Sequence, residues 1–122
     1  MTKAAAIHSF WASFGLAAYE ENAVPADAAF PYITYELVTD AFGGETAMSG
    51  SLWYYGSSWV EANAKADEIC GYIGYAGKVL ECDSGYVWIR CGVPFAQSMG
   101  DPEDDMIRRK LINITAAFYT HR

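Results

Sequence analysis

The stretch that most constrains the fold is residues 57–73, SSWVEANAKADEICGYI, whose apolar spacing predicts one amphipathic helix. Its apolar positions recur at helical intervals and form one stripe: Trp59, Ala62, Ala66, Ile69 and Ile73. Ser58 and Glu61 have the spacing of a capping box, and Gly74 is expected to end the helix. Glu61 and Lys65 stand four residues apart on the other face and are expected to pair. Because the stripe needs an apolar partner, we expect this helix to lie across a sheet.

The composition indicates one folded domain with an unusual supply of aromatic side chains. Of the 122 residues, 52% are hydrophobic and 19% are charged. This is enough for a core without covalent staples and excludes a disordered chain, so residues 1–122 are treated as a single domain. Aromatic residues make up 16%, with nine tyrosines and four tryptophans. These side chains join a large apolar area to a polar tip, so some of them are expected to face a partner.

The charge balance and the cysteines limit the partners and the compartment. A net charge of −7 argues against a groove that holds nucleic acid by its phosphates, although DNA could slide past a negative wall. Three cysteines without CxxC spacing indicate a reducing compartment, and Cys82 and Cys91 are expected to be free thiols. The longest apolar stretch near the start, residues 4–18, is too short to span a membrane. We expect a soluble protein made in a cytoplasm, with no membrane partner.

The first half of the chain is expected to contain a helix and a long hairpin. Residues 3–18 carry apolar side chains at helical spacing, and residues 19–29 are a turn-rich connector. Residues 30–42 alternate as a first strand, and residues 46–55 return as a second strand after a pair of glycines. The two strands should form a long antiparallel hairpin whose tip, residues 41–48, is the least restrained segment of the chain.

Two short strands are expected to follow the central helix. Residues 78–82 and 86–93 have strand character and are joined by a three-residue loop that ends in glycine. This loop length sets Leu80 opposite Trp88 in the predicted register. A second hairpin is therefore expected here.

The end of the chain completes the predicted sheet. Residues 94–105 are expected to be a connector that ends in an acidic run, and residues 107–120 alternate apolar and polar side chains as a last strand. The resulting order is α-β-β-α-β-β-β, with helices and strands segregated along the chain. It predicts an α+β fold in which a mainly antiparallel sheet carries two helices on one face.

The residues suited to catalysis or metal binding do not form a recognisable set. The acid run Asp101–Asp105 supplies oxygen ligands but lacks EF-hand spacing. We expect a solvated loop whose carboxylates meet the basic run Arg108–Lys110 in the chain or on a neighbouring subunit. His8 and His121 have no nucleophile motif beside them, and Cys70 is expected to be a small core residue. We therefore predict no enzyme, no cofactor and no metal site.

A group of aromatic residues surrounds the start of the central helix. Trp53, Tyr54, Tyr55 and Trp59 could stack on bases or sugars. However, the residues around them include no basic side chain before Lys65 that could hold a nucleic-acid backbone. A role in the core and in a subunit contact is the favoured interpretation.

Several landmarks follow one another in a characteristic order. They are a first helix, AYEENAVP, FPYITYEL, SLWYYGSSW running into a helix, and the ending MGDPEDDMIRRKLINITAAFYT. The most telling pieces are Pro25, residues 31–33, residues 57–59 and residues 101–105. In their order and spacing, over nearly the whole chain, these landmarks resemble the tail terminator and tail completion proteins of long-tailed bacteriophages in their short single-domain form.

The resemblance implies a structural virion protein. Such proteins form a ring, commonly a homohexamer, that caps the head-proximal end of the tail tube, stops its growth and joins it to the head connector. The implied partners are further copies of the chain, the tail tube protein and the head-tail connector or stopper protein, with DNA passing through the lumen without specific binding. The implied location is the virion neck, assembled in the host cytoplasm. Another neck protein or minor capsid protein of the connector is an alternative, as is a small intracellular ligand-binding or hydrolase domain.

Two segments are the candidates for contacts between neighbouring subunits. A ring uses one patch on each subunit to meet a different patch on the next, and the expected hairpin and the charged region near the last strand could serve as these patches. The candidate interface residues are Phe42, Gly43, Gly44, Glu45, Tyr54, Tyr55, Asp101, Asp104, Asp105, Arg108 and Arg109.

Overall fold

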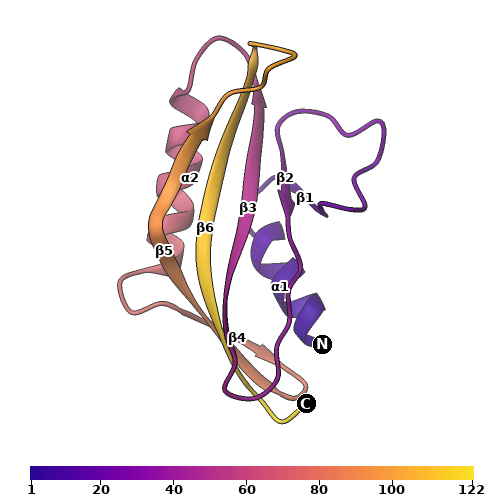
Figure 1. The fold of residues 1–122 in the computed structure, drawn as a ribbon, viewed down its shortest axis with the longest axis vertical. Coiled ribbons are helices and arrows are strands. Elements are labelled where there is room, and N and C mark those ends of the chain that lie inside the picture. The colour runs from indigo at the N-terminus through magenta and orange to yellow at the C-terminus, as the bar shows by residue number, and fades with distance from the viewer.

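Two helices and six strands make up the computed structural model, which describes residues 1–122 (Figure 1). In chain order they are α1 (Lys3–Ala12), β1 (Ala17–Glu20), β2 (Tyr32–Tyr35), β3 (Glu45–Tyr55), α2 (Val60–Ile73), β4 (Lys78–Cys82), β5 (Gly85–Met99) and β6 (Ile107–Thr120). The observed order is therefore α-β-β-β-α-β-β-β. It contains one strand, β1, that the sequence did not predict.

The strands form one sheet in the order β1-β2-β3-β6-β5-β4. All neighbours pair antiparallel except β1 and β2, which are parallel. The α+β class is confirmed, but the sheet is mixed and curls into a half-barrel. Helix α1 packs against both β1 and β4, the two strands at opposite edges of the curled sheet.

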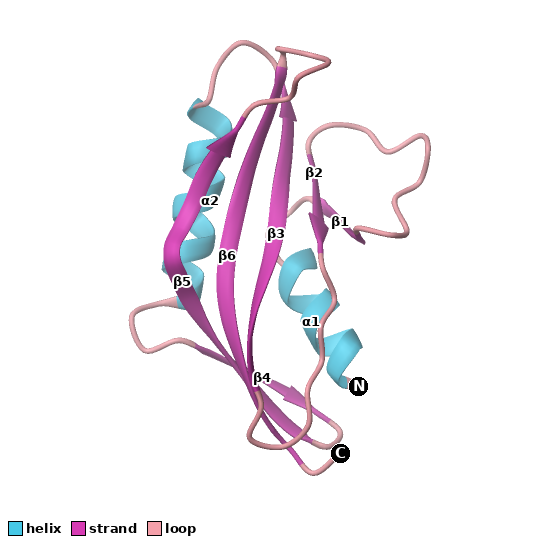
Figure 2. Ribbon diagram, in the orientation of Figure 1, coloured by secondary structure: helices cyan, strands magenta, loops and turns pink.

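Both helices lie on the inner side of this curled sheet, and the outer side carries no helix (Figure 2). Helix α2 packs on β3, β5 and β6. The inner residues of the helices and strands form one core, whose fully buried members include Trp11, Ile33, Leu52, Ile69, Val87, Ile89, Ile112 and Phe118. The outer face is thus the large sheet surface that this chain leaves open.

Helix α2 confirms the predicted stripe from Ala62 to Ile73, whereas Trp59, predicted as its first member, precedes the helix and is half-buried. Ala62, Ala66, Ile69 and Ile73 are buried, and Gly74 ends the helix with a φ of 76°. The capping box is wrong: the helix begins at Val60, and the hydroxyl of Ser58 accepts from the Val60 N–H at 3.1 Å. The pairing of Lys65 with Glu61 is also wrong, because the ammonium group of Lys65 lies 3.0 Å from the carboxylate of Glu68 and donates to the carbonyl of Phe14.

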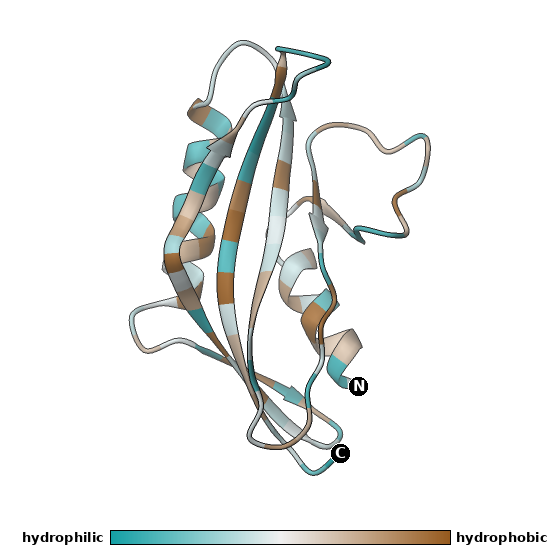
Figure 3. Cartoon of the chain, viewed as in Figure 1, coloured by the Kyte–Doolittle hydropathy of each residue, from teal (hydrophilic) through white to brown (hydrophobic).

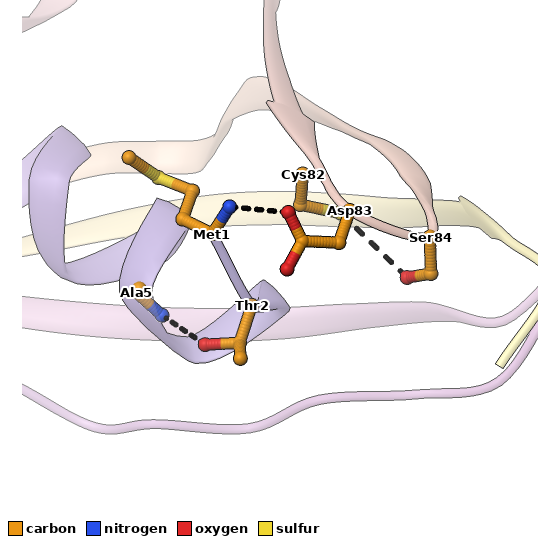
Figure 4. A network of polar contacts seen from close by, with 6 residues as sticks. All are labelled: Met1, Thr2, Ala5, Cys82, Asp83 and Ser84. Carbon is orange, nitrogen blue, oxygen red and sulfur yellow. Dashed lines mark hydrogen bonds and ion pairs between the residues drawn. The ribbon is translucent and has the colours of Figure 1, made fainter.

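Helix α1 is shorter than predicted and is fixed at its start. Thr2 caps it by accepting from the N–H of Ala5 at 3.1 Å, and the N-terminal ammonium group pairs with Asp83 in the turn between β4 and β5 (Figure 4). The helix ends at Ala12, and Gly15 then adopts a φ of 79°. The residues that follow enter β1 rather than a further helical turn.

Trp11 of α1 lies in the centre of the core. Its side chain is fully buried and stacks nearly parallel to the ring of Tyr35, with 6.2 Å between the ring centroids. Gly50 of β3 makes room for it, since a Cβ atom at this position would lie 2.6 Å from Cη2 of Trp11. The glycine is therefore required by the packing of the tryptophan.

The predicted long hairpin is wrong in its extent. Strand β2 pairs with β3 only from Tyr32 to Tyr35, and residues 36–44 form no strand beside it, whereas the opposite edge of β3 pairs over its whole length with β6. The predicted mobile tip is anchored: the N–H of Gly43 donates to the carbonyl of Phe118, and the N–H of Phe118 donates to the carbonyl of Gly44, both at 2.8 Å. The segment before β3 is thus attached to the end of β6.

The strands after α2 keep their predicted positions but change register and length. A two-residue turn sets Leu80 opposite Val87, one position away from the prediction. Strand β5 continues through the first half of the predicted connector to Met99, with an irregularity between Cys91 and Ala96. Strand β6 has the predicted bounds, and Figure 3 shows its alternating hydrophobic and hydrophilic bands. No helix in the structure combines the length and the apolar character needed to cross a bilayer.

Candidate functional site

A row of stacked side chains crosses the outer face of the sheet. We call it the aromatic row and define it as Tyr19 of β1, Tyr32 of β2, Trp53 of β3 and Arg109 of β6. Its members point outward because their neighbours in the strands, such as Ile33 and Leu52, point into the core. The register places Tyr32 opposite Trp53 and Trp53 opposite Arg109.

The contacts along the row hold its side chains in fixed orientations. The ring centroids of Tyr19 and Tyr32 are 6.1 Å apart with an edge-to-face geometry, and those of Tyr32 and Trp53 are 6.1 Å apart and stacked. The guanidinium carbon of Arg109 lies 5.0 Å from the Trp53 ring, a cation–π contact. Trp53 Nε1 also donates to the hydroxyl of Thr34 at 2.8 Å. A partner that binds this row finds side chains that have already lost most of their rotational freedom.

Two further aromatic side chains extend the row toward solvent. Phe30 is 40% exposed and Tyr55 is 54% exposed, and their ring centroids lie 5.4 Å apart. A hydrogen bond to Asp104 and the negative charge of that carboxylate raise the pKa of Tyr55 above its usual value. Tyr55 therefore links the aromatic surface to the acid run.

The acid run forms the loop between β5 and β6 and caps its own backbone. The carboxylate of Asp101 accepts from the N–H groups of Glu103 and Asp104 at 2.8 and 3.2 Å, and that of Asp104 accepts from the N–H of Met106 at 2.9 Å. No group of three or more histidine, cysteine or acidic side chains in the structure is arranged to hold a metal ion. The carboxylates of the run thus serve the shape of the loop.

The expected ion pairs between the acid run and the basic run are wrong within the chain. Arg108 points toward α2, where its guanidinium lies 5.5 Å from the Trp59 ring, and it donates to the backbone carbonyl of Asp105. Arg109 points outward to Trp53 and donates to the hydroxyl of Ser51 at 3.0 Å. The reason is the alternation along β6, which sends consecutive basic side chains to opposite faces.

The predicted interface residues lie at the two ends of the sheet. Tyr55, Asp101, Asp104, Asp105, Arg108 and Arg109 gather at one end, whereas Phe42, Gly43, Gly44 and Glu45 lie at the other, near the C-terminus (Figure 1). Tyr54 points into the core and is 8% exposed, so burial raises its pKa. Glu45 is part of β3 and pairs with Arg90 at 2.8 Å.

Phe42 belongs to a second exposed aromatic group on the outer face. We call it the terminal cluster and define it as Phe42, Tyr86 and Tyr119. The ring centroids of Phe42 and Tyr119 are 6.4 Å apart, and those of Tyr86 and Tyr119 are 5.2 Å apart. Phe42 is 72% exposed. The outer face thus carries one aromatic group near each end.

The sequence identified some aromatic residues of the outer face but not the aromatic residues that strand pairing places beside them. It singled out Trp53 and Tyr55 but not Tyr19, Tyr32 or Phe30. The alternation of side chains around Ile33 was sufficient to predict that Tyr32 points outward. Its position beside Trp53 depends on the register between β2 and β3, which local spacing does not encode.

A cavity of about 720 Å³ lies between α2, β5 and the start of β3. Its polar lining includes the Glu45–Arg90 ion pair and the thiols of Cys70 and Cys91, whose sulfur atoms are 3.8 Å apart. Cys70 is exposed, contrary to the expectation of a core residue, because it follows Ile69 and lies off the apolar stripe. Neither histidine lines this cavity.

No family model, no curated protein and no solved structure matches this chain.

Proposed function

We propose that this protein is a structural subunit of a long-tailed bacteriophage that closes the head-proximal end of the tail tube as a ring. The ring, a homohexamer, ends tube growth and joins the tail tube protein to the head-tail connector or stopper protein. DNA passes through its lumen without specific binding. The protein carries out no catalysis and resides in the virion neck after assembly in the host cytoplasm. The ordered landmarks of the sequence, from Pro25 to the acid run Asp101–Asp105, support this assignment.

The observation that carries the proposal is the aromatic row on the uncovered outer face. Tyrosine, tryptophan and arginine are the residues most enriched at the energetic centres of protein interfaces. Here they are stacked in fixed orientations, so a partner loses little entropy in ordering them. A surface of this kind suits a permanent contact with another protein.

The two aromatic groups also fit the geometry of a closed ring. A heterologous interface needs two different patches on each subunit, and the aromatic row and the terminal cluster are different in composition and lie near opposite ends of the sheet. We assign the row of one subunit to the terminal cluster of the next. This assignment gives Phe42 and Tyr55, both expected at the interface, contacts on opposite sides of the subunit.

The solvent face of α2 supplies a negative wall. Glu61, Asp67 and Glu68 are exposed on it, and Lys65 pairs with Glu68 and donates to the carbonyl of Phe14, so this face keeps a net negative charge. An acidic surface does not hold phosphates, which agrees with DNA that must slide. The lumen of the ring is therefore assigned to this side of the subunit.

The size of the assembly tests the proposal. We expect native mass spectrometry of the purified chain to give a hexamer, and Trp53→Ser or Tyr55→Ser to weaken it while cooperative melting is kept. Tyr75→Ser is the matched control, because Tyr75 is fully exposed but outside both aromatic groups. A protein that stays monomeric at high concentration and is missing as a ring from mature tails would overturn the proposal.

The alternative function, as another neck protein or minor capsid protein of the head-tail connector, requires a ring as well. Antibody labelling of intact particles in the electron microscope separates the two roles. Label at the junction of tube and neck supports the terminator, whereas label on the head side of the connector supports the alternative.

The cavity beside Arg90 favours a second candidate from another class, a small ligand-binding or hydrolase domain. It has the volume of a small-molecule site and a fixed ion pair in its wall. A ligand present at a hundred times its dissociation constant would stabilise the fold by about 2.7 kcal/mol. A metabolite that raises the melting temperature by several degrees, with loss of the effect in Arg90→Ala, would support this candidate over the ring.

A further inference from the structure

Two thiols from different elements meet at the rim of the cavity. Cys70 lies in α2 and Cys91 in β5, and their sulfur atoms are 3.8 Å apart. A disulfide bond is about 2 Å long, so the sulfurs need to approach by roughly another 2 Å. Side-chain rotation supplies movements of this size without a change of fold. The third cysteine, Cys82, lies in β4 beside the hydroxyl of Ser84 and has no thiol partner.

The two thiols differ in their access to reagents. Cys70 is exposed on the helix, whereas Cys91 is half-buried behind it. Burial, and next the contact with Cys70, raises the pKa of Cys91 to about 11. Cys91 therefore keeps its proton at neutral pH, and Cys70 is the sulfur that a dissolved reagent reaches first.

We propose that Cys70 and Cys91 are a redox pair that forms a reversible disulfide with a small-molecule disulfide, such as oxidised glutathione, as the oxidant. In the first step the thiolate of Cys70 attacks one sulfur of the oxidant, a mixed disulfide forms, and one glutathione thiolate leaves. In the second step Cys91 loses its proton and its sulfur attacks the sulfur of Cys70, and the second glutathione leaves. Two cysteine thiols are oxidised, one glutathione disulfide is reduced to two thiols, and the two protons pass to the leaving groups.

The first step removes an obstacle to the second. Part of the raised pKa of Cys91 comes from the hydrogen bond and the charge of Cys70. Once Cys70 is bound in a mixed disulfide, it carries no charge. The contribution of Cys70 to the raised pKa of Cys91 is then lost, whereas the larger contribution of burial remains.

The disulfide would fasten α2 to the part of β5 that has no outer partner. Strand β4 pairs with β5 only as far as Ile89, so β5 forms a free edge of the sheet from Cys91 onward. A cross-link at Cys91 holds this edge against the helix. With the virion location of the proposed function, on which this timing rests, the pair stays open in the reducing cytoplasm and closes after release of a particle to an oxidising medium. The chemistry of the pair does not depend on ring formation.

Peptide mapping of the full-length protein tests the pair. After incubation with excess oxidised glutathione, we expect a cross-linked peptide that joins Cys70 to Cys91, and a melting temperature higher than that of the reduced protein by on the order of 10 °C. Cys82→Ser should behave like the wild type. Cys91→Ser should stop at one glutathione on Cys70, because no second thiol can displace it.

Two results would overturn the proposal. One is separate glutathione adducts on Cys70 and Cys91 of the wild-type protein with no peptide that joins them. The other is a cross-link from either cysteine to Cys82 or to a second chain in place of the internal pair. Both are read from the wild-type protein, so they do not depend on the folding of any variant.

Discussion

Replacing Gly50 by alanine should destabilise the protein through a single added methyl group. The new Cβ would lie 2.6, 2.8 and 3.0 Å from three carbons of the Trp11 ring, and the two shorter distances are closer than Cβ atoms approach other atoms in folded proteins. The ring has little room to move away. It is fully buried, stacks on Tyr35, and meets Phe10 edge-to-face with 5.0 Å between ring centroids. Overpacking of this kind costs about 1–3 kcal/mol of unfolding free energy.

A second substitution shows whether contact with Trp11 causes the loss of stability in Gly50→Ala. Trp11→Phe removes the ring atoms that the methyl group would meet, at a cost of about 2 kcal/mol for the space left behind. It also removes the indole N–H, which is buried without a partner. The double variant Gly50→Ala/Trp11→Phe should therefore be more stable than the sum of the two losses predicts, by about 1–2 kcal/mol.

Urea denaturation of the wild type, the two single variants and the double variant, all at the same protein concentration, measures this coupling. Gly71→Ala is the matched control, because Gly71 lies in α2 with no atom within 4 Å of an added Cβ. It should stabilise the protein by about 0.5–1 kcal/mol. A Gly50→Ala protein as stable as the wild type, or a double variant that loses the full sum, would refute the packing described for Trp11.

Two further predictions concern the core and the tyrosines. Ile69→Asp should give insoluble or unfolded protein, because an unpaired carboxylate would occupy the fully buried site of an isoleucine at a cost of several kcal/mol. The control is Asn63→Asp, an exposed change on the same helix that should be tolerated. A soluble, cooperatively melting Ile69→Asp protein would contradict the position of Ile69 in the core. Burial raises the pKa of Tyr35 and Tyr54 above the usual 10.0 and thus favours their neutral forms in the folded state. Their contribution to stability is complete below pH 10.0 and is lost as the pH rises through their higher folded values. Melting temperatures measured between about pH 8 and pH 11 should fall at the alkaline end, and a rise there would contradict the assignment.

The elements that were predictable from the sequence are those with a long, regular pattern. In β6 the apolar residues Ile112, Ile114, Ala116 and Phe118 alternate over half of the strand, and its bounds were predicted correctly. The stripe of α2 was equally clear. Both patterns are produced by burial on one face, which acts on every second residue of a strand and on every third or fourth residue of a helix.

The missed features depend on contacts between distant residues. Strand β1 consists of Ala17–Glu20, too short to show a period, and exists because it pairs in parallel with β2. The long hairpin was wrong because residues 36–44 form no strand, so β2 pairs with only part of β3, whose other edge pairs fully with β6. The candidate interface shows the same division: Trp53 and Tyr55 were identified, whereas Tyr19 and Tyr32 join them only through strand pairing.

The position of β6 in the sheet sets a condition on synthesis of the protein. This strand is the last element in the sequence, yet it lies between β3 and β5 and contributes Ile112, Ile114 and Phe118 to the core. Until residues 107–120 have left the ribosome, β3 and β5 have no strand between them, and their apolar faces and unpaired backbone groups are open to solvent. Folding therefore waits until residues 107–120 have left the ribosome. During this interval the unpaired edges of β3 and β5 are exposed to association with those of other chains.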